Sequence, residues 1–445
     1  MQKNDIYEIQ ITGMTDDGCG VGRLNGFAVF VPYTIVGETV RIVLIKVLKS
    51  YAVGKLIEVI KPSEHRTKSL CKNFYQCGGC ALWHMSYDEE LKFKKQKVAD
   101  CLTRIAKLKN PRIENVVAAD SFDRYRNKSQ FPVTENGIGM YAAHSHRLIE
   151  MNDCLIASKA VKPIINSVRY WMKQFSVPAY NEHTGHGLIR NIYIRGGRSG
   201  SLVTIVTAKR ELYRSKELID ELRACGTPIC GIVQNVNVKN TNTILGSENK
   251  TLYGSGFLKD DIGGIEFEIS PLSFYQVNKP QTKKLYQIAK ECAGLTGSET
   301  LLDLYCGIGT IGLFMSDKVR RIIGIETSEA AVRDARRNAE INNITNAEYY
   351  SGKAEELIDL IKQKNYAPDV AVLDPPRKGC GKKLLSGIAD IKSLRRIVYI
   401  SCKPSTLARD IEQLAEYGFF PQRIIPVDMF PRTPHVETVV LLTKI

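Results

Sequence analysis

The chain has 445 residues, of which 44% are hydrophobic and 24% charged, a balance that is ordinary for a globular protein of two or three domains. No apolar run approaches the roughly 18 residues that a membrane-spanning helix needs, and residues 1–10 lack the apolar segment of a secretory signal, so we expect a cytoplasmic protein. The net charge of +15 is concentrated in residues 61–260, where 31 Lys and Arg stand against 18 Asp and Glu and carry 13 of the excess charges. Such a local excess predicts a polyanionic partner, such as nucleic acid.

Residues 1–60 alternate apolar and polar side chains in short runs, which predicts strands at 6–11, 27–31, 40–47 and 53–60. Between the first two runs lie Gly18, Gly20 and Gly22, where we expect a turn. Several short strands within so few residues predict a small β-barrel that ends near Pro62.

The pattern is least regular in residues 61–270, for which we expect a central α+β domain. Residues 88–109 predict a helix, because acidic side chains open it and Lys107 and Lys109 end it, as the helix dipole favours. Its basic side chains predict either a solvated face or contact with RNA, and the helix can pack on the C-terminal domain despite its place in the sequence. Runs at 188–195, 201–207 and 231–237 predict strands of one sheet.

A cysteine motif opens the central region, where Cys71, Cys77 and Cys80 fall within ten residues. Gly78 and Gly79 let the loop fold back so that the sulfurs converge. In a long chain of this kind the spacing predicts a metal site rather than disulfides. The spacing leaves the fourth ligand open, and His84 would complete a zinc site of three cysteines and one histidine.

Residues 271–445 predict a doubly wound α/β domain, because apolar runs alternate with helical segments. Two further runs without a helix between them, at 419–427 and 435–442, predict an antiparallel hairpin at the end of the sheet. The five expected parallel strands lie at 301–305, 321–326, 348–351, 370–374 and 397–401.

The first of these strands leads into a glycine turn of the form G-x-G-x-x-G at residues 307–312. This turn lets a nucleotide approach the backbone, and Glu326 at the end of the next strand can accept both ribose hydroxyls. These features allow either NAD or S-adenosylmethionine. Asp303 within the first strand and Asp374-Pro375-Pro376-Arg377 after the fourth favour S-adenosylmethionine, because such a tripeptide resembles the substrate-facing loop of class I methyltransferases.

Cys402 follows the fifth strand, and Pro404 fits the first turn of the next helix. Nearby amides and Lys403 predict a lowered pKa for this thiol. A thiolate that adds to carbon 6 of a pyrimidine makes carbon 5 nucleophilic, so Cys402 is the candidate nucleophile. The carbon-5 proton must later be removed, and Glu437 at the start of the last strand is the candidate base.

Five segments, at 271–278, 301–312, 374–377, 401–404 and 435–437, resemble the RNA uracil-5-methyltransferase family in the same order. Residues 1–60 resemble a TRAM domain, an RNA-binding barrel. The resemblance implies that Cys402 is the nucleophile and Glu437 the base. It also implies that S-adenosylmethionine contacts Gln276, Tyr305, Gly307, Gly309, Glu326 and Asp374.

The ribosomal-RNA branch of that family carries a 4Fe–4S cluster, and Cys154 matches its distant fourth ligand. The resemblance therefore implies a cluster held by Cys71, Cys77, Cys80 and Cys154. It also implies that RNA contacts Arg126, Lys128 and Phe274. The tRNA branch typically lacks both barrel and cluster, so we expect a monomer that acts on 23S ribosomal RNA. A tRNA uracil-5 enzyme, an RNA cytosine-5 enzyme and a non-catalytic RNA-binding protein remain as alternatives.

Overall fold

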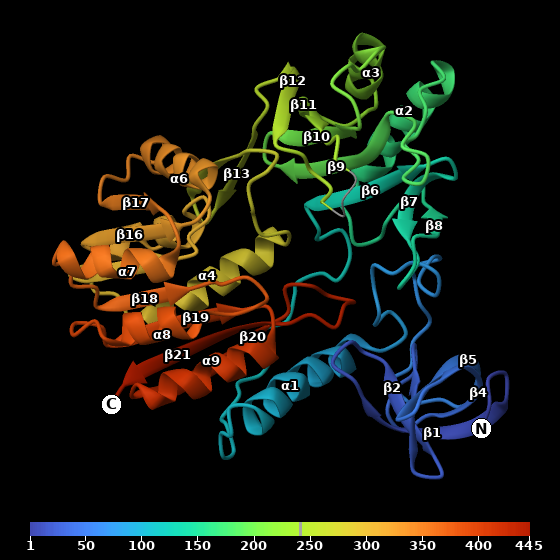
Figure 1. The fold of residues 1–445 in the computed structure, drawn as a ribbon, viewed down its shortest axis with the longest axis horizontal. Coiled ribbons are helices and arrows are strands. Elements are labelled where there is room, and N and C mark those ends of the chain that lie inside the picture. Colours follow the sequence, from blue (N-terminus) through green and yellow to red (C-terminus); the bar gives the residue numbers. More distant parts are fainter. Residues whose placement is uncertain (240–242) are drawn as a thin grey trace.

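The computed structural model describes residues 1–239 and 243–445 (Figure 1). Its first five strands form a closed barrel in the order β1-β2-β3-β5-β4. The strands are β1 (Ile6–Met14), β2 (Gly20–Leu24), β3 (Phe27–Val31), β4 (Thr39–Val47) and β5 (Tyr51–Lys61).

Gly18 lies in the predicted turn with a φ of 86°, whereas Gly20 and Gly22 lie within strand β2. A Cβ at Gly20 would lie 2.0 Å from Thr34 Oγ1, and one at Gly22 would lie 2.8 Å from the carbonyl oxygen of Gln10. These glycines are therefore needed for close packing inside a small barrel, and not for a turn.

The central region contains a seven-stranded sheet in the order β12-β11-β10-β9-β6-β7-β8. The three strands predicted here are neighbours in it, with β9 and β10 antiparallel and β10 and β11 parallel. Helices α2 (Val161–Gln174) and α3 (Ser215–Arg223) share a hydrophobic core with the sheet. The strands are β6 (Lys128–Thr134), β7 (Gly137–Tyr141), β8 (Leu148–Glu150), β9 (Ile189–Gly197), β10 (Gly200–Thr207), β11 (Ile229–Val236) and β12 (Glu248–Gly254).

The predicted basic helix is α1 (Tyr87–Arg104), which ends before Lys109. Ser86 caps its start by accepting a hydrogen bond from the Glu89 amide at 3.4 Å. Val98 and Leu102 are fully buried in a core that α1 shares with α9 (Pro404–Glu416). A helix from the first quarter of the chain thus lies against the C-terminal part (Figure 1).

The C-terminal sheet has the order β17-β16-β15-β18-β19-β21-β20. Its first five strands are parallel, and the last two form the predicted antiparallel hairpin. These strands are β15 (Thr300–Leu304), β16 (Arg321–Glu326), β17 (Ala347–Ser351), β18 (Val370–Leu373), β19 (Arg396–Ser401), β20 (Phe419–Val427) and β21 (Glu437–Lys444). The helices are α4 (Lys279–Ala293), α5 (Thr310–Phe314), α6 (Glu329–Ile341), α7 (Ala354–Gln363), α8 (Lys382–Ala389) and α9. The predicted α/β class is confirmed.

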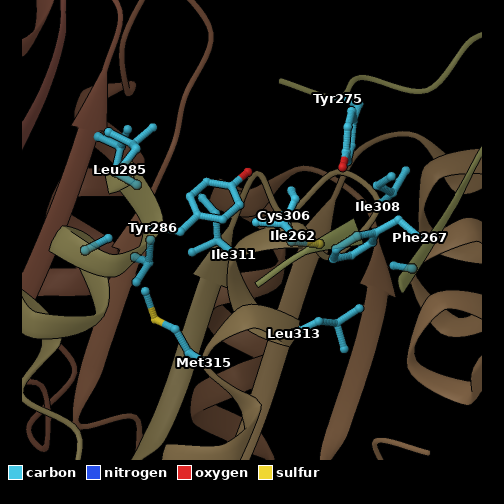
Figure 2. Packing of buried hydrophobic residues seen from close by; sticks show 14 of the residues in the cluster. Ile262, Phe267, Tyr275, Leu285, Tyr286, Cys306, Ile308, Ile311, Leu313 and Met315 are labelled. Atoms are coloured by element: carbon cyan, nitrogen blue, oxygen red, sulfur yellow. The ribbon is translucent and has the colours of Figure 1, made fainter. Parts of the chain in front are cut away.

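A hairpin of β13 (Leu258–Ile262) and β14 (Ile265–Ile269) leads into the C-terminal part and joins its core. Figure 2 shows this core, where Tyr286 of α4 lies beside Ile311 of α5. The Tyr286 hydroxyl and Thr310 Oγ1 are hydrogen bonded at 2.8 Å. This packing fixes the helix that follows the glycine turn. Within the described part of the chain, no helix is long and apolar enough to span a membrane.

Candidate active site

A cavity of about 910 Å³ lies where the central sheet faces the carboxyl edge of the C-terminal sheet. Ligands of open α/β folds bind at this edge, because the loops that follow the parallel strands converge there. The cavity is lined by every predicted site residue except Gly309 and Lys128. Those residues are Cys71, Cys77, Cys80, Arg126, Cys154, Phe274, Gln276, Tyr305, Gly307, Glu326, Asp374, Cys402 and Glu437.

Cys402 stands between β19 and α9 as predicted, with Pro404 in the first helical turn. The predicted lowering of its pKa is wrong. Burial, followed by the charges of Glu437 and Asp374, raises the pKa of the thiol to about 11, and Arg377 only partly offsets this. In the ligand-free protein the desolvation of the thiolate therefore outweighs the favourable amides at the start of the helix.

Glu437 is the first residue of β21, and its side chain is 4% exposed. Burial, followed by the charge of Asp374, raises its pKa well above the usual range, while Arg377 opposes the shift. A carboxylate with a raised pKa is a stronger base than a solvated one, which suits proton abstraction near neutral pH.

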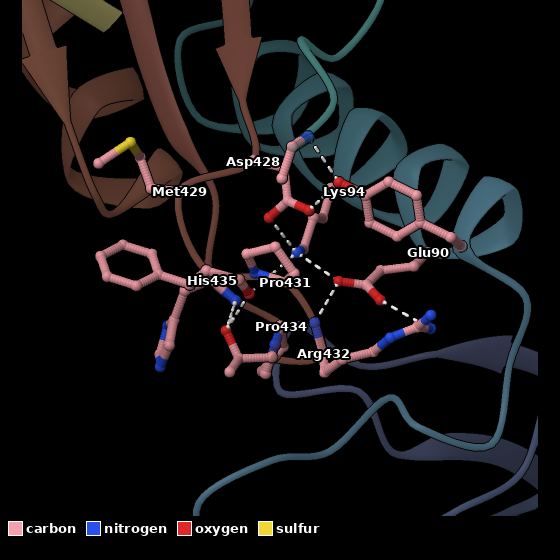
Figure 3. Close-up of polar contacts among 12 residues, drawn as sticks. Glu90, Lys94, Asp428, Met429, Pro431, Arg432, Pro434 and His435 are labelled. Atoms are coloured by element: carbon pink, nitrogen blue, oxygen red, sulfur yellow. Dashed lines mark hydrogen bonds and ion pairs between the residues drawn. The ribbon is translucent and has the colours of Figure 1, made fainter. Parts of the chain in front are cut away.

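A buried charged network fixes the segment that leads into Glu437, residues 428–436 (Figure 3). Lys94 Nζ of α1 donates to Asp428 Oδ1 at 2.6 Å and to Glu90 Oε1 at 2.7 Å. Glu90 Oε1 also accepts a hydrogen bond from the backbone amide of Arg432 at 2.7 Å. The side chains of Glu90, Lys94 and Asp428 are fully buried. Side chains of helix α1 therefore hold the backbone of residues 428–436, and this segment positions the proposed base Glu437.

No sequence motif pointed directly to this network, since the basic helix was expected to be solvated or bound to RNA. A spacing of four residues places Glu90 and Lys94 on the same helical face as Val98 and Leu102. An acidic and a basic residue on the same helical face as two apolar residues is the sequence pattern that could have predicted a buried ion pair.

The residues expected to contact the cofactor meet around the glycine turn. Glu326 Oε2 accepts a hydrogen bond from the Gly307 amide at 3.2 Å, and Tyr305 has a left-handed φ of 64° that turns the chain into the loop. Gly309 starts α5 and faces the neighbouring core, because a Cβ there would lie 2.8 Å from the hydroxyl of Tyr349. Gly309 therefore shapes the turn without lining the cavity.

Two buried carboxyl groups make this site suitable for a cation. Burial raises the pKa of Asp374 to about 7, and burial together with the charges of Asp374 and Glu326 does the same for Asp303. Asp303 Oδ2 accepts a hydrogen bond from the Gly312 amide at 2.9 Å, whereas its buried Oδ1 has no hydrogen-bond partner in the described residues. A positively charged ligand would stabilise both carboxylates, so the site fits the sulfonium of S-adenosylmethionine.

The four predicted cluster cysteines line the same cavity as Cys402. Cys77 Sγ accepts a hydrogen bond from the Gly79 amide at 3.3 Å. His84, the alternative ligand, is turned away, because its Nε2 lies 3.3 Å from the carbonyl oxygen of Thr34 in the barrel. Cys154, and not His84, lines the cavity together with the three cysteines of the motif.

The thiols do not match a site for a single ion. Among the described residues, no three His, Cys, Asp or Glu side chains are arranged to hold one metal ion. Tetrahedral zinc with bonds of about 2.3 Å would require sulfurs about 3.8 Å apart. Four cysteine side chains around one cavity are the type of ligand set that a 4Fe–4S cluster requires.

The fold and the site define a class I methyltransferase, and comparisons with known proteins extend this assignment. A model of the tRNA (uracil-5-)-methyltransferase family matches residues 260–445, and the TRAM domain model matches residues 2–57. Uncharacterized RNA methyltransferases of Clostridium acetobutylicum and Halalkalibacterium halodurans are 44% and 40% identical to the chain, covering 100% and 99% of it and 98% of each relative.

A crystal structure of the tRNA (uracil-54, C5)-methyltransferase of Pyrococcus abyssi with S-adenosyl-L-homocysteine has a TM-score of 0.81 to this chain at 28% identity. The match covers 98% of this chain and 99% of that one. The chain belongs to the RNA uracil-5-methyltransferase family and carries a TRAM domain. It is an S-adenosylmethionine-dependent enzyme that methylates carbon 5 of uracil in RNA.

Proposed function

We propose that the protein methylates carbon 5 of uridine in 23S ribosomal RNA, with Cys402 as nucleophile and Glu437 as base. One observation carries the residue roles. Cys402 and Glu437, which are 35 positions apart, line one cavity together with Asp374 and Arg377. A nucleophile, a buried base and a cation at the carboxyl edge of the sheet are the groups that the reaction needs.

The Cys402 sulfur attacks carbon 6 of the uracil and forms a covalent bond, which leaves carbon 5 electron-rich. Its thiol proton must leave first and passes to solvent, so that Glu437 remains a carboxylate for the later removal of the carbon-5 proton. After carbon 5 has gained the methyl group, Glu437 removes the carbon-5 proton. The electron pair of that C–H bond re-forms the double bond, and the sulfur of Cys402 departs.

We assign the contacts to the cofactor to Gln276, Tyr305, Gly307, Glu326 and Asp374, with Gly309 shaping the turn. When bound, S-adenosylmethionine supplies an electrophilic methyl group on a sulfonium centre. Asp374 and Asp303 would then offset that positive charge, and Glu326 would accept hydrogen bonds from the ribose. We also propose that Cys71, Cys77, Cys80 and Cys154 hold a 4Fe–4S cluster that stabilises the wall of the cavity.

A second candidate substrate is tRNA, and the Pyrococcus abyssi structure is the observation that favours it. That protein is a tRNA enzyme, yet its likeness to this chain extends over 98% of the length, including the barrel. The barrel by itself therefore does not exclude tRNA. The proposal of 23S RNA therefore depends on the four cysteines, which match the cluster ligands of the ribosomal branch.

The residue roles are tested by trapping the covalent intermediate. Glu437→Gln retains size and hydrogen bonding but has no basic group, so addition and methyl transfer should proceed and elimination should fail. We expect this variant to accumulate a methylated RNA–protein adduct that survives denaturing electrophoresis. Cys402→Ala should give neither adduct nor product, and the double variant should behave like Cys402→Ala. Normal turnover by Glu437→Gln would exclude it as the base.

The target is tested separately by mapping 5-methyluridine in 23S RNA and in tRNA from a strain that lacks the gene. We expect the loss of one or more 5-methyluridines from 23S RNA, restored by the wild-type gene and not by a gene encoding Cys402→Ala. Loss confined to tRNA would replace the ribosomal assignment with the tRNA one and would leave the residue roles intact.

A further inference from the structure

Three basic side chains beside the cavity have no acidic partner. Arg126 precedes β6, Lys128 begins it, and Arg195 lies on β9 directly opposite Lys128 in the antiparallel pairing. In the described part of the chain, none of the three forms an ion pair with an Asp or Glu side chain, although many other basic residues do. Arg126 Nε instead donates to the carbonyl oxygen of Lys128 at 2.8 Å.

The charge of Arg195 is the most notable of these, because the residue is only 2% exposed. Its Nη2 donates to the hydroxyl of Tyr193 at 3.3 Å and to the carbonyl oxygen of Ser273 at 2.8 Å. Its Nε and Nη1 are buried, and neither has a hydrogen-bond partner in the described residues. Buried guanidinium groups are normally paired, because desolvating an unpaired charge is costly. Two free donors on a buried cation indicate an anionic ligand.

The pKa shifts of Tyr193 and Lys128 show the same excess of positive charge. Burial would raise the pKa of the Tyr193 phenol, but the charges of Arg195 and Lys128 outweigh burial and lower that pKa. The pKa of Lys128 is lowered by burial and, in addition, by the charges of Arg195 and Arg126. An anion at this position would stabilise all three cations.

Aromatic side chains complete a surface suited to a nucleotide. Lys128 Nζ lies 5.9 Å from the ring centre of Tyr193 and 5.9 Å from that of Phe274. Phe274 is 61% exposed and lines the cavity that holds Cys402. Exposed aromatic rings stack on bases while adjacent cations bind the backbone, which is the usual combination for single-stranded nucleic acid.

We propose that Lys128 and Arg195, with the Tyr193 hydroxyl, form a binding site for one phosphodiester group of the RNA strand beside the target uridine, and that Phe274 stacks on the adjoining base. The inference rests on the proposed function, because it takes the cavity at Cys402 to be the site of the target uracil. The bound phosphate fixes how the strand enters the cavity and so helps to hold the uridine outside its stack.

The test is methylphosphonate scanning of a short single-stranded RNA that contains one uridine, with methylation of that uridine by the wild-type enzyme measured in parallel. Each phosphate in turn is replaced by a neutral methylphosphonate, and RNA affinity is measured for the wild type, Lys128→Gln and Arg195→Gln. One position should weaken binding to the wild type by about tenfold, as expected for a lost charged contact. At that same position the replacement should have a smaller effect on each variant than on the wild type, because each variant retains only one of the two cations.

Two controls distinguish loss of the phosphate contact from general damage to the fold: the salt dependence of RNA affinity and a matched variant. The slope of log affinity against log salt should fall in magnitude by about 0.7 in each variant, as for one phosphate contact to a single strand. Arg190→Gln is the control, because Arg190 lies on the same strand, is 8% exposed and is satisfied by the carbonyl oxygens of Asn237 and Lys239. Its slope and its phosphonate profile should match the wild type, and affinity for S-adenosylmethionine should be unchanged in all variants.

The outcomes separate this site from the proposed function. If Lys128→Gln retains the full phosphonate effect at every position, the phosphate site is refuted, and it is equally refuted if Lys128 and Arg195 couple to different phosphates. Should Arg195→Gln fail to fold, Lys128→Gln alone decides the result. If the wild type binds the RNA with the expected profile but does not methylate any uridine, the proposed function falls and the phosphate site stands.

Discussion

Lys94 Nζ lies 2.6 Å from Asp428 Oδ1, although the two residues are 334 positions apart in the chain. The contact joins α1 to the segment that runs from β20 into Glu437. The same segment is held from a second side, where the amides of Ala81 and Leu82 donate to the carbonyl oxygen of Arg432 at 3.0 and 3.1 Å. Because Cys80 immediately precedes Ala81, the cysteine loop and the proposed base share one rigid connection.

Replacing Lys94 should therefore damage both stability and catalysis. Lys94→Met fits the space but leaves the carboxylates of Glu90 and Asp428 buried without their cation. Removing one partner of a buried ion pair usually costs about 3–5 kcal/mol. We expect a loss of this order in the free energy of unfolding, measured with urea, and a lower kcat at saturating RNA and S-adenosylmethionine.

Lys92→Met provides the control on the same helix. The side chain of Lys92 is 65% exposed and faces Glu89 at 3.3 Å, and exposed pairs contribute at most about 1 kcal/mol. Its stability and kcat should stay close to the wild type. Equal losses in both variants would show that α1 tolerates no substitution and would remove the special role of Lys94.

The sequence predicted the C-terminal part well because most of its parallel strands are largely apolar runs, and polar motifs follow the strands that border the site. Asp374 and Cys402 follow neighbouring strands, so the topology brings them to one edge without further information. The network at Lys94 and the free charge of Arg195 could not be predicted in this way. The sequence does not show whether a charged side chain is solvated or buried, and the partners of these side chains come from distant segments.

The pKa of Cys402 was missed for a related reason. Local sequence shows the helix start and Lys403, which favour the thiolate, but it does not show how much water the fold removes. Nor does it show that Glu437 comes from the far end of the last hairpin. Desolvation and approaching carboxylates are consequences of tertiary structure, and here they determine the sign of the shift.

Arg377 should keep the thiol of Cys402 reactive, because its charge lowers a pKa that burial otherwise raises to about 11. We expect Arg377→Gln to raise that pKa further and to slow alkylation of Cys402 by iodoacetamide near pH 8. The decrease should be up to about tenfold, the effect of one pKa unit. Peptide mass spectrometry distinguishes this thiol from the other cysteines, and the exposed Lys383→Gln on α8 is the control. Unchanged alkylation would mean that Arg377 does not influence the nucleophile.

Binding of S-adenosylmethionine should weaken as the pH falls below 7. Burial raises the pKa of Asp374 from 3.8 to about 7, so the ligand-free protein holds this proton between those values, and folding stability falls as the pH rises through that window. A cationic ligand requires the carboxylate, so binding below pH 7 must expel the proton.

Calorimetric titration should show the affinity falling, for each pH unit below 7, by about tenfold for each carboxylate that must ionise. Asp374→Asn should bind more weakly at high pH and show a shallower dependence, with the remainder due to Asp303, whose pKa is also about 7. Asp390→Asn, at a side chain 71% exposed, should retain the full dependence. A wild-type affinity that is constant from about pH 5.5 to 8 would contradict the assignment of Asp374 to the cofactor.

Cys154 and His84 are the two candidates for the fourth metal ligand, and the spacing of the cysteine motif does not distinguish them. Cys154 lines the cavity with Cys71, Cys77 and Cys80, whereas His84 is directed to the barrel. Protein purified without oxygen should be brown, with broad absorbance near about 400 nm that arises from cysteine-ligated iron. Cys154→Ser should lose most of this absorbance and most of its iron, because serine is a poor substitute for a thiolate ligand. His84→Gln, which can still donate to Thr34, should keep both.

If metal analysis instead finds one zinc and no iron, and His84→Gln releases that zinc while Cys154→Ser retains it, the iron–sulfur cluster is excluded and His84 is the fourth ligand.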